Sequence, residues 1–88
     1  DDVMALAAIR RIRDAGLSVP EHISVIGFND MFPFPPGSPT LSSMRLPLVE
    51  IGKTAAQMLL DIVSGKKVEN DTVIFTPEYI RRESVKPL

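Results

Sequence analysis

The chain has 88 residues, 44% of them hydrophobic and 24% charged, a globular composition whose length allows one small domain or a piece of a larger one. The formal net charge of -1 excludes the basic surface that binding to a DNA backbone requires. The lack of cysteine excludes disulfide bonds, thiolate zinc sites and a cysteine nucleophile.

A helix is predicted at the start of the chain, from about Asp2 to Ala15. Aspartate is a good N-cap, because its carboxylate accepts hydrogen bonds from the unpaired N–H groups of a helix start. Gly16 can adopt the left-handed conformation that ends a helix. The apolar residues of one face recur at helical spacing: Ala5, Ala8, Ile9 and Ile12.

A buried strand is predicted after a turn at residues 19–21. Residues 23–28 are nearly all apolar and partly β-branched, which is typical of a strand covered on both faces in a parallel sheet. Asn29 and Asp30 end this strand. A helix that leads into such a strand indicates an α/β fold.

Residues 31–40 are predicted to form a loop, since prolines and Gly37 exclude regular structure there. Phe32 and Phe34 in this loop either form a contact surface or fold back onto the core. A short strand over residues 41–46 follows, and then a helix that begins at Pro47 and ends at Gly65. One stripe of that helix is apolar: Ile51, Ala55, Met58, Leu59 and Ile62. A strand at residues 73–75 and an extended segment at residues 78–84 complete the prediction.

No catalytic or metal-binding pattern is present, so an enzyme is not predicted, and no cofactor or metal is expected. The single histidine, His22, lies in the turn before the first strand and has no nucleophile at a recognisable spacing. No apolar run approaches the roughly 20 residues of a membrane helix, and we expect no membrane partner.

Two polar clusters are predicted to meet at one edge of the sheet. Ligands of open α/β sheets bind beyond the carboxyl ends of the strands, where Asn29 and Asp30 lie. In an α/β unit the helix start at Asp1 and Asp2 lies at the same edge. Short polar side chains there can bind a sugar-like or nucleobase-like ligand. We interpret Asp2 and Asp30 as caps of the helix and the loop.

Several segments together resemble the LacI/GalR family of transcriptional repressors. They occur in the family's order and spacing across nearly the whole chain. They are Asp1-Asp2-Val3-Met4-Ala5-Leu6, Gly16-Leu17-Ser18-Val19-Pro20-Glu21-His22-Ile23-Ser24-Val25-Ile26-Gly27-Phe28-Asn29-Asp30, Pro39-Thr40-Leu41-Ser42-Ser43-Met44-Arg45 and Arg81-Arg82-Glu83-Ser84-Val85.

The resemblance implies a fragment of a two-lobed periplasmic-binding-protein type I fold, with parallel sheets flanked by helices. The chain would be the C-terminal part of the effector-binding domain. Residues 1–44 and 77–88 would belong to the C-terminal lobe and residues 45–76 to the N-terminal lobe. The DNA-binding headpiece would be absent from this numbering, although the rest of the protein is expected to exist.

By resemblance, Asp1 and Asn29 face the effector. Both depart from the commonest residue type, with Asp for Asn and Asn for Asp, so one carboxylate and one amide are kept. Leu46 and Leu48 match positions that are often polar or aromatic ligand contacts; here they are apolar, so either the effector is less polar than a plain sugar or these residues only pack. The first helix implies a dimer interface, or alternatively packing within one chain, for Leu6, Ile9, Arg10 and Arg13.

The function implied is that of a cytoplasmic, ligand-regulated repressor that acts as a homodimer and reaches operator DNA only through the headpiece. A periplasmic sugar-binding protein of a transporter shares the fold and is the alternative. A small enzyme on a Rossmann-like fold is a third hypothesis, for which the chain offers no catalytic residues.

Overall fold

The computed structural model describes residues 1–31 and 36–88, so the prediction for Phe32 and Phe34 lies outside the described residues. The chain divides into two compact units. Unit 1 comprises Asp1–Leu46 and Pro77–Leu88, and unit 2 comprises Pro47–Thr76.

Helix α1 (Asp2–Asp14) begins at Asp1, whose Oδ1 accepts a hydrogen bond of 3.0 Å from the Met4 N–H. It ends at Ala15, and Gly16 follows with φ 82°, in the left-handed region. The predicted helix and its stop are therefore confirmed. Its buried residues are Asp2, Ala5 and Ile9, whereas Ala8, which was assigned to the apolar stripe, is exposed.

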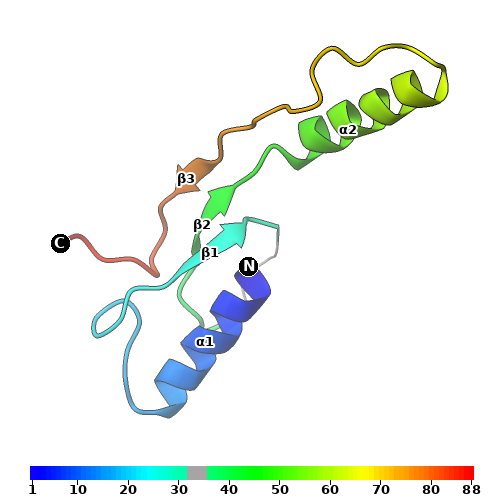
Figure 1. The fold of residues 1–88 in the computed structure, drawn as a ribbon. Helices are drawn as coiled ribbons and strands as arrows, with labels where there is room; N and C mark the ends of the chain where they lie inside the picture. Colours follow the sequence, from blue (N-terminus) through cyan, green and yellow to red (C-terminus); the bar gives the residue numbers. More distant parts are fainter. Residues whose placement is uncertain (32–35) are drawn as a thin grey trace. The chain divides into compact units, whose positions relative to one another are not determined.

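A three-stranded sheet of order β1-β2-β3 forms the rest of unit 1, with β1 (Ile26–Asn29), β2 (Ser42–Arg45) and β3 (Glu78–Ile80). β1 and β2 are parallel, with Phe28 opposite Met44. β3 is antiparallel to β2, with Tyr79 opposite Met44. The sheet is thus mixed: the expected parallel pairing is confirmed for β1 and β2, whereas β3 departs from it. Helix α1 packs against β1 on one side of the sheet (Figure 1).

The strand β1 is covered on one face only, which corrects the prediction of a strand buried on both faces. Gly27 is buried beneath α1, whereas Ile26 is 50% exposed and Phe28 is 44% exposed. The strand also begins three residues later than residues 23–28 suggested. The apolar run at residues 23–28 predicted a strand correctly. Burial of the second face of β1 requires a second layer to cover it, and the described residues of unit 1 do not supply one.

Among the described residues, the apolar core of unit 1 is small and is supplemented by buried polar groups. Ala5, Ile9 and Leu41 form it, and Leu6, Val19 and Val25 pack against it. The described polar residues that are also buried are Asp2, Ser42, Ser43 and Ser84. Every buried polar side-chain atom in the described part of the chain has a hydrogen-bond partner, so none of them carries the full cost of desolvation.

Ser84 joins three segments of unit 1. Its Oγ accepts a hydrogen bond from the Ser42 N–H and donates one to the Val25 carbonyl, both 2.7 Å long. Its backbone N–H donates to Thr40, and its carbonyl accepts from the Val25 N–H. The end of the chain is therefore held between the segments that lead into β1 and β2.

Unit 2 contains helix α2 (Leu48–Val63), which begins after Pro47 and ends at Ser64, before Gly65 at φ 80°. The predicted helix is confirmed, but none of its residues is buried, because residues 47–76 contain no other regular element to cover its apolar stripe. Residues 73–75 do not form the predicted strand, since they have no strand to pair with. No helix in the described part of the chain is long and apolar enough to cross a membrane.

Gly27→Ala is expected to lower the free energy of unfolding by about 1–3 kcal/mol, because overpacking a filled site forces displacement. An added Cβ would overlap the Asp2 carboxylate and lie 2.9 Å from Leu41 Cδ2. Urea denaturation followed by circular dichroism measures the change. Gly52→Ala is the control, because an added Cβ there meets nothing within 4 Å. Equal stability of both variants would contradict the close contact between β1 and Asp2.

Candidate functional site

The start of α1 lies at the edge of the sheet where β1 ends (Figure 1). Asp2 joins the two: its Oδ2 accepts a hydrogen bond of 3.1 Å from the Met31 N–H, and its Oδ1 accepts one of 2.7 Å from Ser43 Oγ. The Asp2 residue is 3% exposed. Asp2 therefore anchors the loop after β1. Our interpretation of Asp2 as the helix cap is wrong, because Asp1 is the cap.

Asn29 and Asp30 form a turn in an unusual backbone conformation, with φ 103° and φ 60°. Two consecutive non-glycine residues with positive φ are uncommon, because the Cβ crowds the backbone there. The Asp30 carboxylate is held by two guanidinium groups, which corrects its interpretation as a loop cap. This position had no local signal for an ion pair, since Arg82 is 52 residues away in the sequence.

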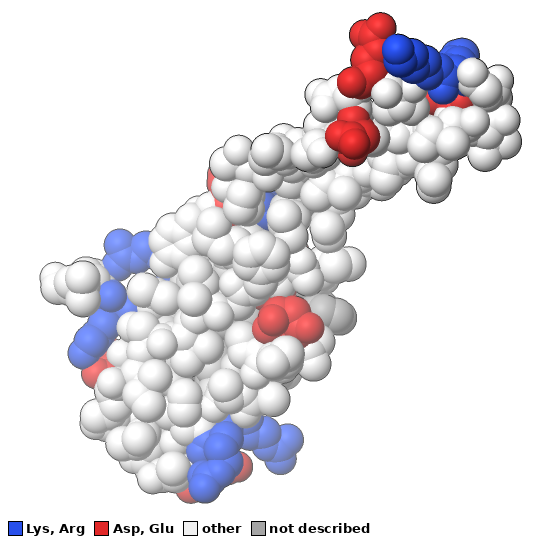
Figure 2. Space-filling model, in the orientation of Figure 1, with Lys and Arg blue, Asp and Glu red and all other residues white. Residues whose placement is uncertain are grey.

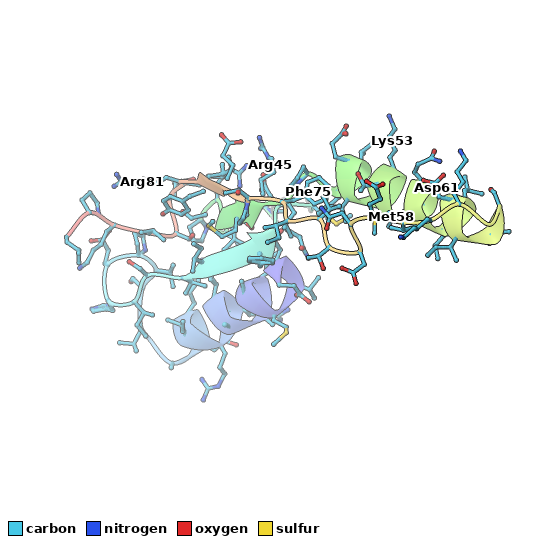
Figure 3. The ribbon with its side chains drawn as sticks, turned by 45° about the horizontal axis from the view of Figure 1, so that its top comes forward. Arg45, Lys53, Met58, Asp61, Phe75 and Arg81 are labelled. Carbon is cyan, nitrogen blue, oxygen red and sulfur yellow. The ribbon has the colours of Figure 1, made fainter. Side chains whose placement is uncertain are left out.

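Arg82 binds Asp30 through two nearly parallel hydrogen bonds, NH1 to Oδ1 at 2.6 Å and NH2 to Oδ2 at 3.1 Å. Arg45 lies at the end of β2 (Figure 3). Its Nε donates a hydrogen bond of 2.9 Å to Asp30 Oδ2, and its NH2 lies 2.8 Å from the same oxygen. Paired bonds of this kind fix the orientation of a carboxylate as well as its position.

The electrostatics of this cluster favour the ionised carboxylate. The hydrogen bond from Arg82 is the main cause that lowers the pKa of Asp30, with Arg45 adding to it against the opposing effect of burial. The same hydrogen bond raises the pKa of Arg82. The Asp30 side chain is 7% exposed, compared with 22% for Arg82 and 51% for Arg45. Asp30 and Arg82 thus form the more sheltered pair.

The predicted effector residues differ in their surroundings. Asp1 is exposed and uses Oδ1 for the helix cap, whereas Asn29 is half-buried; both lie at the edge that Asp2 joins. Leu46 is half-buried at the end of unit 1. Leu48 is 38% exposed and is the first residue of α2 in unit 2. Their contact with an effector stays a prediction.

Of the residues predicted at a dimer interface, Ile9 is 1% exposed and belongs to the core of unit 1. Packing within one chain, the alternative for this residue, agrees with that burial, and its contact with a partner stays a prediction. Leu6 is half-buried and packs against that core, whereas Arg10 is exposed. Arg13 is exposed too and donates a 2.9 Å hydrogen bond to the Gly37 carbonyl. Figure 2 shows basic side chains gathered at the C-terminal end of α1.

Sequence reasoning missed the residues that support the edge. Residues 82–84 were quoted only as a family signature, yet Arg82 binds Asp30 and Glu83 accepts hydrogen bonds from Thr40. His22, expected to be a solvated turn residue, is exposed and accepts a hydrogen bond of 2.9 Å at Nδ1 from the Ser18 N–H.

Two hollows formed by the described residues lie away from the predicted effector residues. The larger one, about 670 Å³, is open and lies around the C-terminal end of α1, between Arg13, Gly16 and Glu83. It lacks the enclosed, largely apolar walls of a small-molecule site. We therefore favour the edge at Asn29 on chemical grounds. In residues 1–31 and 36–88, no group of three or more His, Asp or Glu side chains is placed to hold a metal ion.

Comparisons with known proteins agree over nearly the whole chain. Residues 1–85 match the family described as "Periplasmic binding protein-like domain". The HTH-type transcriptional repressor PurR of Aliivibrio fischeri is 41% identical over 97% of this chain and 25% of its own length. The HTH-type transcriptional regulator GntR of Pseudomonas aeruginosa is 40% identical over 96% of this chain and 24% of its own length.

A solved structure agrees with the fold. The crystal structure of the Escherichia coli transcriptional repressor ascG superposes with a TM-score of 0.76 at 33% identity, covering 97% of this chain and 31% of that one. The chain thus spans about a quarter of the length of the curated relatives that it matches.

Asp30→Asn is expected to lower the free energy of unfolding at pH 7 by about 1–3 kcal/mol, because it weakens charge-assisted hydrogen bonds. The folded-state pKa of Asp30 lies below its ordinary value of 3.8. The ionised carboxylate therefore stabilises the fold fully above that value, and this contribution is lost as the pH falls from there through the lowered folded-state pKa.

Urea denaturation of both proteins over a series of pH values measures this effect, and the difference between them should shrink at the acid end. Asp14→Asn, at the exposed end of α1, is the control and should change the unfolding free energy at pH 7 by no more than about 0.5 kcal/mol. A difference for Asp30→Asn that stays constant across the whole range would show that the ion pair does not act as described.

Proposed function

The chain belongs to the periplasmic binding protein-like domain family, and we propose that it is part of the effector-binding domain of a LacI-type transcriptional repressor. Its relatives with similar sequence and structure carry the names of transcriptional repressors and regulators. These names do not favour the alternative of a transporter's binding protein, nor do they favour an enzyme.

The effector site that we propose lies at the carboxyl edge of β1 in unit 1 and includes Asp1, Asn29 and Leu46. Leu48 is proposed as an effector contact on the resemblance alone. The observation that carries this proposal is the joining of two polar clusters at one edge, through the hydrogen bond from the Met31 N–H to Asp2. Short carboxylate and amide side chains there suit the hydroxyl groups of a sugar-like effector.

The proposed division into lobes is supported by the two compact units. Unit 1 ends at Leu46 and resumes at Pro77, close to the boundaries at residues 44 and 77 that the resemblance implies. Residues 1–44 and 77–88 would then lie in the C-terminal lobe and residues 45–76 in the N-terminal lobe. We propose that the chain is the C-terminal part of that domain.

In this mechanism the effector would bind between the lobes and favour one of two arrangements. A ligand shifts such an equilibrium only by the difference in its affinity for the two states. The shift would alter how the headpieces of a cytoplasmic homodimer sit on operator DNA, which is a coupling between two distinct sites. This chain's own contribution would be to hold the effector contacts at the edge of β1.

The regulatory proposal is tested on the full-length protein that contains this chain. Its affinity for an operator DNA first selected by binding from genomic fragments is measured by fluorescence anisotropy with and without saturating D-glucose, D-galactose, D-ribose or adenine. A change in operator affinity with one of them supports the proposal. Operator binding that none of the four alters, although calorimetry shows one of them bound, would end the regulatory claim.

Asn29→Gly is expected to weaken binding of the compound that calorimetry detects by about three- to tenfold, the loss of one hydrogen bond to a ligand. Glycine is the suitable replacement, because it removes the amide but tolerates φ 103°. Isothermal titration calorimetry gives the affinity. Asn70→Gly, in an exposed position of unit 2, is the control and should bind as the wild type does. Unchanged affinity in Asn29→Gly would remove this side chain from the site.

Arg10→Glu is expected to weaken the proposed homodimer by about tenfold, because reversing a charge at an interface costs favourable electrostatic interactions. Sedimentation velocity over a dilution series measures the dissociation constant. Arg11→Glu reverses a neighbouring exposed charge on α1 that the interface is not expected to include. Equal dimer affinity in both variants would place the interface elsewhere.

A further inference from the structure

The loop after β1 is held at the two residues that follow Asn29. The Met31 N–H donates to the buried Asp2 carboxylate at the start of α1. The Asp30 carboxylate is bound by Arg82 and Arg45. Unfavourable backbone conformations persist only where the surrounding structure holds them, and here the two positive φ values, at Asn29 and Asp30, directly precede the Met31 anchor.

The Arg82 anchor is itself fixed by buried groups. Its backbone N–H donates to Ser42 Oγ at 2.7 Å, and its carbonyl accepts from the same hydroxyl at 3.1 Å. Ser42 is 0% exposed. NH1 of Arg82 also donates to the Leu41 carbonyl at 2.8 Å. The guanidinium is thus tied to the backbone before β2 as well as to Asp30, which fixes both its position and its plane.

Arg45 has a different character, because its side chain is 51% exposed. Its Nε and NH2 both contact Oδ2 of Asp30. Arg45 therefore places a positive charge beside one oxygen without setting the orientation of the carboxylate. Arg82 contacts both oxygens in a planar fork, a geometry that a lysine ammonium does not reproduce. The orientation of Asp30 therefore depends mainly on Arg82.

We propose that Asp30 and Arg82 are positioning residues, which hold Asn29 in the left-handed conformation that presents its amide to the effector. This inference rests on the proposed function, since it assumes that Asn29 contacts the effector. Neither Asp30 nor Arg82 needs to touch the effector in this arrangement. They act by reducing the conformations that the turn can adopt before the effector binds, so less ordering is required on binding.

The test compares four full-length proteins: the wild type, Arg82→Lys, Arg82→Gln and the control Glu83→Gln. Glu83 is the next residue and bonds to Thr40 rather than to the turn, so it reports the purely structural effect of altering this segment. Calorimetry with D-glucose, D-galactose, D-ribose and adenine gives affinity. Amide chemical shifts and HN–Hα couplings of Asn29, by NMR without ligand, report its backbone conformation.

We expect Arg82→Gln to weaken binding of the compound that the wild type binds by about tenfold or more, as for loss of hydrogen bonds to a charged group. We also expect the Asn29 shifts and couplings to change, because φ of Asn29 would leave the positive region. Arg82→Lys keeps the positive charge but loses the two hydrogen bonds of the planar guanidinium. The loss of affinity and the change at Asn29 should therefore both occur, but be smaller than in Arg82→Gln. Glu83→Gln should leave both as in the wild type, at a temperature where all four proteins are folded.

Two outcomes would overturn the proposal. If Glu83→Gln weakens binding as much as Arg82→Gln does, the effect is one of general stability. If the Asn29 couplings are the same in all four proteins, Arg82 does not hold the turn. Failure of the proposed function is recognised separately, because the wild type would then bind none of the four compounds. In that case the claim that Asn29 meets such an effector falls. The NMR measurement still decides whether Arg82 holds Asn29.

Discussion

The hydrogen bonds made by residues 82–84 are the interaction on which unit 1 depends. Ser84 bonds to Val25 and Ser42, and Arg82 bonds to Ser42 and Asp30. Among the residues that the structure describes, the buried apolar core consists of Ala5, Ile9 and Leu41, so the hydrophobic burial of these residues alone holds the segments weakly. Buried polar groups are stabilising when every member is satisfied and costly when one partner is lost, which makes this short segment decisive for the arrangement of β1 and β2.

The candidate site follows from the same constraint. Gly27 lets α1 approach β1 closely enough for the Asp2 carboxylate to lie against the strand, and from there Asp2 reaches both Ser43 and Met31. Arg82 then fixes Asp30 from the opposite end of the sequence. Asn29 directly precedes the two anchored residues, Asp30 and Met31, so the residue proposed to meet the effector would be placed by side chains that do not need to touch it.

The exposed apolar surfaces agree with the proposal that this chain is part of a larger two-lobed domain. Ile26, Phe28 and Tyr79 are each about half exposed on the sheet, and α2 buries none of its residues. Extended apolar surface of this kind is unusual on a protein that acts alone and generally marks a contact. A domain in which further elements cover these faces would account for them, as the relatives' greater length allows.

The sequence by itself determined the features that depend on neighbouring residues. An aspartate at the helix start, the apolar spacing of Ala5 and Ile9 and the left-handed stops at Gly16 and Gly65 are local signals. The two helices were predicted correctly because such signals act within a few residues, although the capping residue is Asp1 and not Asp2. The end of β1 at Asn29 was predicted for the same reason.

Only the tertiary structure decided which polar groups meet and which faces are covered. Asp2 and Asp30 were interpreted as caps because their partners, Ser43 and Arg82, are 41 and 52 residues away. The segment 73–75 has the composition of a strand without a strand to pair with, and Phe28 has the composition of a buried residue without a layer to cover it. Strand pairing and burial depend on residues that are distant in the sequence. A local pattern therefore shows only that a segment can form a strand or pack in a core, and the tertiary structure decides whether it does.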